Sequence, residues 1–116
     1  MARVLLLEDD RALNRMMNTI LTSAKHEVLP ILDGAGALDL LASNPDLIVL
    51  DLLLPSLDGS TFLAEAVSRG YGGKVLVVSG ADDGRELARM MGAEGFLAKP
   101  FEPEDLEIAV KKTLAT

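Results

Sequence analysis

Polar side chains of complementary chemistry follow directly after apolar runs in this 116-residue chain. The pairs of run and side chain are VLLL with Glu8 and Asp9, LIVL with Asp51, VLVV with Ser79, and GFLA with Lys99. Charged groups next to such runs need partners or a ligand that offset the cost of desolvation. If the runs are parallel strands, their carboxyl ends meet at one edge of a sheet and the five side chains form one site.

Three carboxylates held within a few ångströms of one another repel, so either a pKa rises or a cation binds. Hard oxygen ligands select Mg²⁺ or Ca²⁺, and a small acidic site that leaves room for phosphate oxygens favours Mg²⁺. Asp51 could then act as a nucleophile that forms an acyl phosphate. Lys99 and Ser79 could neutralise and hydrogen-bond the phosphoryl oxygens. For Asp51 taken alone, a carboxylate that caps a loop is the simpler interpretation.

The elements that would position these side chains can be read from the spacing of apolar residues. Strands are predicted at residues 3–7, 26–32, 46–50, 74–78 and 95–98. Helices are predicted at 10–24, from a cap at Asp33 to about residue 43, at 60–69, from a cap at Asp82 to residue 91, and from Pro103 to about residue 114. Residues 52–59 are expected to form a loop. The apolar stripe of the first helix contains Leu13, Met16, Met17, Ile20 and Leu21.

Strict alternation of strands and helices predicts an α/β fold of the (βα)₅ type, a doubly wound, flavodoxin-like parallel sheet with helices on both faces. Pro30 cannot donate a hydrogen bond to a neighbouring strand, which favours an edge position for the second strand. The expected strand order is therefore 2-1-3-4-5, and a ligand would bind between strands one and three, at their carboxyl ends.

Composition excludes several other classes of protein. The net charge of −7 argues against direct binding of nucleic acids or anionic membranes. The chain has no cysteine, so neither disulfides nor thiolate zinc sites are possible. No apolar run approaches the roughly 20 residues that span a bilayer, and we expect a soluble, cytoplasmic protein. His26 opens the second strand at the wrong edge for the site, so a structural role is expected for it.

Four motifs in order resemble the receiver domain of two-component response regulators. They are VLLLEDD at 4–10, LIVLDLLLPSLDG at 47–59 with Pro55 and the Asp58-Gly59 pair, VLVVSG at 75–80, and GFLAKPF at 95–101. Each motif alone is weak, but all four at this spacing are highly specific. The resemblance covers residues 1–116 as one receiver domain, and it identifies no effector domain.

The resemblance implies a role for each matching residue. Asp51 would be the phosphoacceptor, and Ser79 and Lys99 would contact the phosphoryl oxygens. The Mg²⁺ ligands would be the carboxylates of Glu8, Asp9 and Asp51 and the backbone carbonyl of Leu53.

A second set of positions concerns the conformational switch that the resemblance implies. Ser79 would move toward the phosphoryl group, and Phe96 would be the aromatic residue whose rotamer follows activation. The peptide bond between Lys99 and Pro100 would be cis. The surface of the fourth helix, fifth strand and fifth helix would change as a result.

The implied partners are a histidine kinase or histidine phosphotransfer protein as donor, and a protein target or an attached output domain. The domain would be no enzyme beyond its own phosphorylation and dephosphorylation. The main alternative is a receiver-like adaptor that binds proteins without phosphorylation. A flavodoxin-like redox carrier would need a glycine- and hydroxyl-rich loop where EDDRALN stands, and an aspartate-based phosphatase would need an acid at Leu53.

Overall fold

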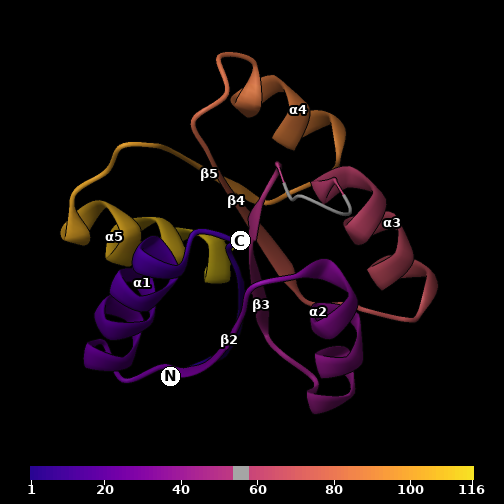
Figure 1. Ribbon diagram of the computed structural model, residues 1–116, viewed down its shortest axis with the longest axis horizontal. Coiled ribbons are helices and arrows are strands. Elements are labelled where there is room, and N and C mark those ends of the chain that lie inside the picture. Colours follow the sequence, from indigo (N-terminus) through magenta and orange to yellow (C-terminus); the bar gives the residue numbers. More distant parts are fainter. Residues whose placement is uncertain (54–57) are drawn as a thin grey trace.

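The computed structural model describes residues 1–53 and 58–116. Its centre is a parallel sheet in the order β2-β1-β3-β4-β5, which confirms the predicted order (Figure 1). The strands are β1 (Arg3–Leu7), β2 (Glu27–Ile31), β3 (Leu47–Asp51), β4 (Lys74–Ser79) and β5 (Gly95–Ala98).

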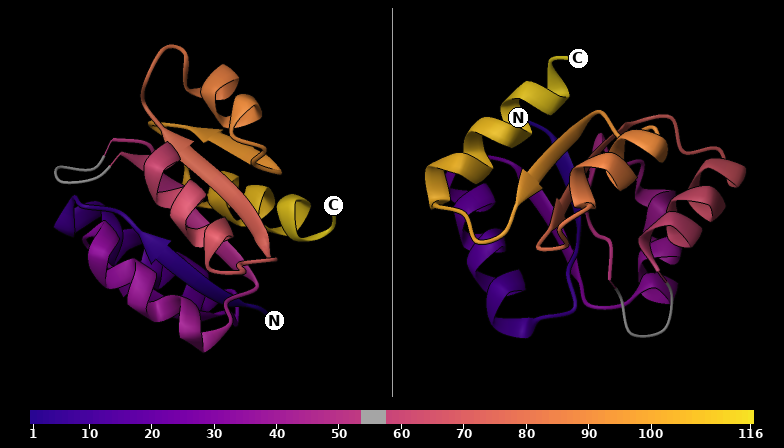
Figure 2. Two further views of the ribbon diagram at one scale, coloured as in Figure 1. Left: turned by 90° about the vertical axis from the view of Figure 1, so that its right-hand side faces the viewer. Right: turned by 90° about the horizontal axis from the view of Figure 1, so that it is seen from above.

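Helices cover both faces of the sheet, as the alternation of elements predicts. One face carries α1 (Arg11–Ser23) and α5 (Pro103–Leu114). The other face carries α2 (Gly34–Leu40), α3 (Gly59–Ser68) and α4 (Gly84–Met90). A short 3₁₀ turn, η1 (Leu41–Ser43), continues α2. The two further views in Figure 2 show the same division into three layers.

The continuous apolar runs are explained by the two cores that the sheet separates. Successive side chains of a strand point to opposite faces. Val4 and Leu6 therefore pack toward α1 and α5, whereas Leu5 and Leu7 pack toward α2, α3 and α4. A strand buried on both faces cannot alternate with polar residues, so the runs end only where each strand leaves the core.

Aspartate side chains fix the starts of three helices. Asp10, Asp33 and Asp58 each accept a hydrogen bond from the backbone N–H three residues later. Such caps satisfy one of the free N–H groups of the first turn. Asp10 also begins α1 directly after the polar end of β1, which brings this helix close to the site. The cap predicted at Asp33 is confirmed.

Several details of the predicted elements were wrong, and three of them bear on the site and its supporting helices. The position before α4 is Asp83, not Asp82, and its side chain makes no capping bond; α4 starts instead where Gly84 packs into the core. β3 begins at Leu47 and includes Asp51 as its last residue. Met16 is 41% exposed, because α1 turns the stripe of Asn14, Met17 and Leu21 inward.

β2 is the outer strand on one side, with Pro30 exposed one residue before its end. A proline at this place removes a donor from the free edge and discourages pairing with another chain.

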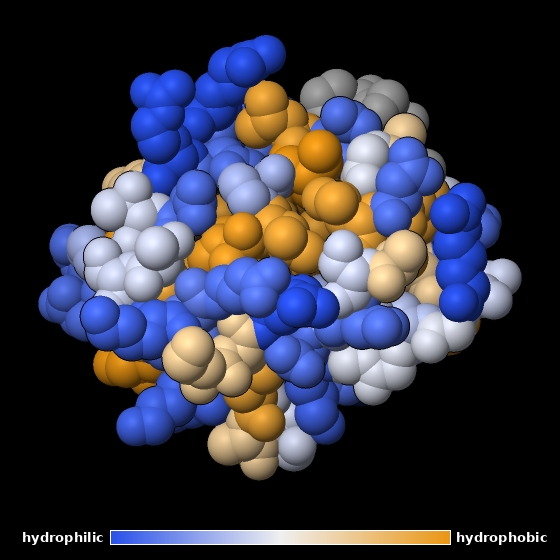
Figure 3. Space-filling view, turned by 90° about the horizontal axis from the view of Figure 1, so that it is seen from below, coloured by the Kyte–Doolittle hydropathy of each residue, from blue (hydrophilic) through white to orange (hydrophobic). Residues whose placement is uncertain are grey.

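Figure 3 views the molecule from below and shows a central apolar patch within a border of hydrophilic residues. Across residues 1–53 and 58–116, no helix is both long and apolar enough to cross a bilayer.

The contact between β5 and α5 depends on a glycine. A Cβ added at Gly95 would overlap the Thr113 hydroxyl oxygen and would lie 3.1 Å from Leu76 Cδ1. We expect Gly95→Ala to lower the free energy of unfolding by about 1–3 kcal/mol through overpacking. The measurement is urea unfolding of Gly95→Ala, Thr113→Ala and the double variant. Because Thr113→Ala removes the overlapping hydroxyl, the two losses should not add; additive losses would contradict the overlap.

Candidate functional site

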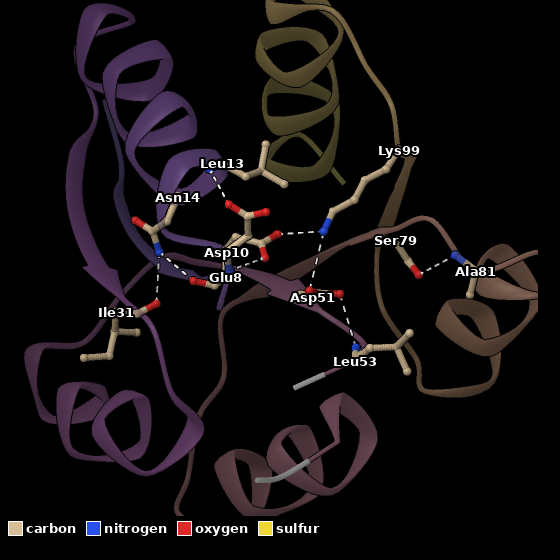
Figure 4. A network of polar contacts seen from close by, with 10 residues as sticks. All are labelled: Glu8, Asp10, Leu13, Asn14, Ile31, Asp51, Leu53, Ser79, Ala81 and Lys99. Carbon is tan, nitrogen blue, oxygen red and sulfur yellow. Dashed lines mark hydrogen bonds and ion pairs between the residues drawn. The ribbon is translucent and has the colours of Figure 1, made fainter. Parts of the chain in front are cut away.

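The ends of β1 and β3 bring three acids together. Oxygen atoms of Glu8, Asp9 and Asp51 all lie within 4.8 Å of one another. Glu8 and Asp51 are buried, whereas Asp9 is partly exposed. The loop after β1 and the end of β3 thus form an acidic pocket that consists of these three residues. Figure 4 shows its centre, with Glu8 and Asp51 drawn as sticks.

Lys99 reaches this pocket from the end of β5. Its ammonium group lies 2.8 Å from Glu8 Oε1 and 3.5 Å from Asp51 Oδ2, with 24% of its side chain exposed. Burial lowers the pKa of Lys99, but the hydrogen bond to Glu8 and the charge of Asp51 outweigh this effect and raise the pKa. Lys99 therefore stays protonated and supplies the positive charge that this pocket contains.

Glu8 illustrates the competing forces in the pocket. Desolvation is the largest influence and raises the pKa of Glu8, and the charge of Asp51 acts in the same direction. Hydrogen bonds from Lys99 and from the backbone N–H of Asp10 act in the opposite direction, and the net pKa is raised. Binding of a further cation beside Glu8 would therefore be favourable, because the cation would stabilise the ionised carboxylate.

Asn14 is a supporting residue that the sequence analysis missed. Its side-chain amide donates to the backbone carbonyls of Glu8 (3.0 Å) and Ile31 (3.1 Å), so α1 is tied to the ends of both β1 and β2 (Figure 4). Asn14 is buried on the same face as Met17 and Leu21. A polar residue at helical spacing within an apolar stripe was the available signal, because such a residue must be hydrogen-bonded.

Ser79 ends β4 beside this pocket and is buried. Its hydroxyl oxygen accepts a hydrogen bond from the Ala81 N–H at 3.1 Å. The Leu53 N–H donates to Asp51 Oδ1 at 3.2 Å, while the Leu53 side chain is exposed. Pro55, which matched a receiver motif, lies outside the residues that the structure describes.

The remaining predicted positions are also located by the structure. Phe96 is a partly buried residue of β5 that packs against the core on the α4 side of the sheet. The peptide bond between Lys99 and Pro100 is cis. His26 lies at the other edge of the sheet, where its Nδ1 accepts the Ala2 N–H at 3.2 Å. It has no contact with the acidic pocket within the part of the chain that the structure describes.

The composition of the pocket fits magnesium. It offers carboxylate oxygens only, and such hard ligands suit Mg²⁺, which retains waters and accepts phosphate oxygens beside one or two carboxylates. Three acids against one lysine also leave the pocket with excess negative charge.

Comparison with known proteins assigns this geometry to a family. Residues 4–111 match the response regulator receiver domain. The chain belongs to that family. The receiver is 36% identical over 107 residues to response regulator MprA from Mycobacterium sp. strain KMS. The matched segment covers 90% of this chain and 46% of MprA. The chain therefore spans about half the length of the curated relatives it matches.

Solved structures agree with this assignment. The receiver superimposes on the chemotaxis protein CheY4 of Vibrio cholerae with a TM-score of 0.89 at 26% identity, covering 97% of this chain and 98% of that one. It superimposes on NtrX of Brucella abortus with a TM-score of 0.91 at 27% identity, covering 98% of this chain but 27% of that one. The fold thus occurs both as a whole protein chain and as one part of a longer regulator.

Magnesium is expected to stabilise the receiver through its acidic pocket. A ligand at ten times its dissociation constant adds about 1.4 kcal/mol to the free energy of unfolding. Asp9→Asn should stabilise the metal-free protein by about 1 kcal/mol, because it removes one repelling charge, and should lose most of the magnesium effect. The measurement is urea unfolding with and without MgCl₂ at constant ionic strength.

Asp10→Asn is the matched control for this prediction. Asp10 is the neighbouring acid, but its carboxylate caps α1, and asparagine caps helices equally well. This variant should keep the full magnesium effect. An equal magnesium effect in Asp9→Asn and in the unsubstituted protein would show that Asp9 is not a ligand.

Proposed function

We propose that this receiver accepts a phosphoryl group on Asp51 in a magnesium-dependent reaction and signals through the resulting change of shape. The observation that carries the proposal is the position of Asp51. Its carboxylate is buried at the end of β3, close to Glu8 and Asp9 after β1, and the ammonium group of Lys99 bridges Glu8 and Asp51. A nucleophile, a cation site and a fixed positive charge therefore meet at one point.

The proposed reaction is transfer from a phosphohistidine. A carboxylate oxygen of Asp51 attacks phosphorus, the bond from phosphorus to the imidazole nitrogen of the donor breaks, and that nitrogen keeps the electron pair. The product is an acyl phosphate. Asp51 needs no general base, because the attacking oxygen carries no proton when the carboxyl group is ionised. Water later attacks the acyl phosphate and returns the carboxylate and inorganic phosphate.

The charge that accumulates on the phosphoryl oxygens must be balanced. Lys99 lies close enough to Asp51 to contact those oxygens. Ser79 is a further candidate, because its described contact uses the oxygen as acceptor and the hydroxyl hydrogen can still be donated. Magnesium, held by the carboxylates of the acidic pocket and the Leu53 carbonyl, would supply the remaining positive charge.

The proposed partners follow from the chemistry. The donor is a histidine kinase or a histidine phosphotransfer protein, because Asp51 needs an activated phosphoryl group. The receiver then controls a separate protein target or an attached output domain through the surface of α4, β5 and α5. In this scheme it turns over no substrate except its own phosphoryl group.

The test is intact mass spectrometry after incubation with acetyl phosphate, with and without Mg²⁺. We expect a gain of one phosphoryl group that requires Mg²⁺. Reduction with borohydride converts an aspartyl phosphate to homoserine, and peptide mapping should find it at position 51. If there is no gain and beryllofluoride, a non-covalent mimic of the acyl phosphate, also fails to bind, the proposed phosphorylation is wrong and the result favours a phosphorylation-independent adaptor.

A further inference from the structure

The first residue of α4 lies against two residues of the proposed switch. Gly84 is buried, and a Cβ added there would lie 3.0 Å from Phe96 Cε1 and 3.2 Å from Ser79 Cβ. Contacts of this length are tighter than ordinary van der Waals contact. The backbone at the start of α4 therefore approaches both side chains as closely as only a glycine allows.

The next residue of α4 contacts the same ring from outside. The guanidinium carbon of Arg85 lies 4.9 Å from the centroid of the Phe96 ring. A cation at this distance over an aromatic face is attracted by the ring. Arg85 is otherwise exposed to solvent. The ring thus has the backbone of Gly84 at its edge and the cation of Arg85 over its face, and both come from the start of α4.

We infer that Arg85 is a positioning residue that holds the Phe96 ring in its resting place and couples it to α4. The inference rests on the proposed function for its link to phosphorylation. When Ser79 moves toward a phosphoryl group on Asp51, it leaves its position beside Gly84, and the packing of Gly84 against Ser79 and Phe96 loosens. The cation of Arg85 favours the resting place of the ring, so it opposes that change.

The size of this bias can be estimated. A solvent-exposed cation–π contact changes an equilibrium by about two- to fivefold. Loss of the Arg85 charge should therefore favour the switched state by this factor. A ligand that binds the switched state, such as beryllofluoride with Mg²⁺, should then reach half-saturation at a concentration about two- to fivefold lower.

The experiment compares Arg85→Met with Arg89→Met by NMR of protein labelled with ¹³C in the phenylalanine rings. Arg89 lies on the same helix and pairs with Glu86, so its replacement removes the same charge without touching the ring. The chain has three phenylalanines, and the Phe96 signal can be assigned with Phe96→Leu. In the unphosphorylated protein, the Phe96 signal should shift in Arg85→Met and stay in place in Arg89→Met.

Beryllofluoride titration supplies the second readout. Removal of a positive charge alone should weaken the binding of an anion, so the expected tighter binding to Arg85→Met has the opposite sign. Arg85→Met should have no such effect in a Phe96→Leu background. An unshifted Phe96 signal in Arg85→Met, or equal half-saturation of Arg85→Met and the unsubstituted protein, would overturn the inference.

The two proposals can fail separately. If the unsubstituted protein binds no beryllofluoride and takes up no phosphoryl group, the proposed function is wrong. The Phe96 signal of the unphosphorylated protein still decides whether Arg85 positions the ring, because that readout requires no phosphoryl chemistry.

Discussion

Replacement of Asp51 by asparagine should abolish the mass gain from acetyl phosphate. Asparagine has nearly the same shape, so the end of β3 should keep its packing between β1 and β4. The amide lacks the ionised oxygen that attacks phosphorus, and no acyl phosphate can form at this position. The measurement is intact mass after incubation with acetyl phosphate and Mg²⁺, beside the unsubstituted protein.

Asp58→Asn is the matched control for Asp51→Asn. Asp58 lies at the start of α3 and accepts hydrogen bonds from the Thr61 N–H and the Ser60 hydroxyl, and these bonds hold the pKa of its carboxyl group below the usual value. Asparagine can replace it as a cap. This control should gain one phosphoryl group as before. Labelling that persists in Asp51→Asn would show that another acid is the acceptor, with the partly exposed Asp9 of the same acidic pocket as the first candidate.

Replacement of Lys99 by methionine should slow phosphorylation by about 100- to 1000-fold, the usual effect of removing one group that stabilises charge in a transition state. Methionine keeps the apolar length of the side chain but removes the cation beside Asp51. The measurement is the rate of labelling by acetyl phosphate at saturating Mg²⁺. A rate within a few-fold of the unsubstituted protein would show that Lys99 has only a structural role.

The loss of Lys99 should lower the folding stability of the receiver as well as its rate of phosphorylation. Glu8 is only 2% exposed, and in Lys99→Met it loses its ion-pair partner. The free energy of unfolding should fall by about 1–3 kcal/mol, the cost of leaving a buried polar group without its partner. Added Mg²⁺ should recover part of the loss. Lys111→Met, which removes an exposed lysine of α5, should change neither stability nor labelling.

The fold could be predicted from the sequence because each strand is a continuous apolar run. Burial on both faces demands such runs, and the cores on the two sides of β1 show why Val4 to Leu7 has no polar residue. The place of the site followed from the same pattern. A parallel sheet brings the ends of its strands to one edge, so Glu8, Asp51 and Lys99 had to approach one another.

Other details depend on packing that has no sequence pattern of its own. Asp82 and Asp83 are equally good caps by residue type, and the burial of Gly84 decided where α4 begins. The apolar stripe of α1 suggested that Met16 faces inward, but the hydrogen bonds of Asn14 to two strand ends favour a different rotation of the helix. The position of Arg85 over Phe96 joins two elements and could be found only in three dimensions.

The amide of Asn14 has a mechanical consequence for the whole site. Through it, the last carbonyl of the edge strand β2 and the carbonyl of Glu8 share one donor. Edge strands have one neighbour, and regions with few contacts open first in the native state. Local opening of β2 and loosening of the backbone at Glu8 should therefore occur together. Amide hydrogen exchange in β2 should then report on how firmly Glu8 is held, because Ile31 of that strand also accepts the Glu8 N–H at 3.2 Å.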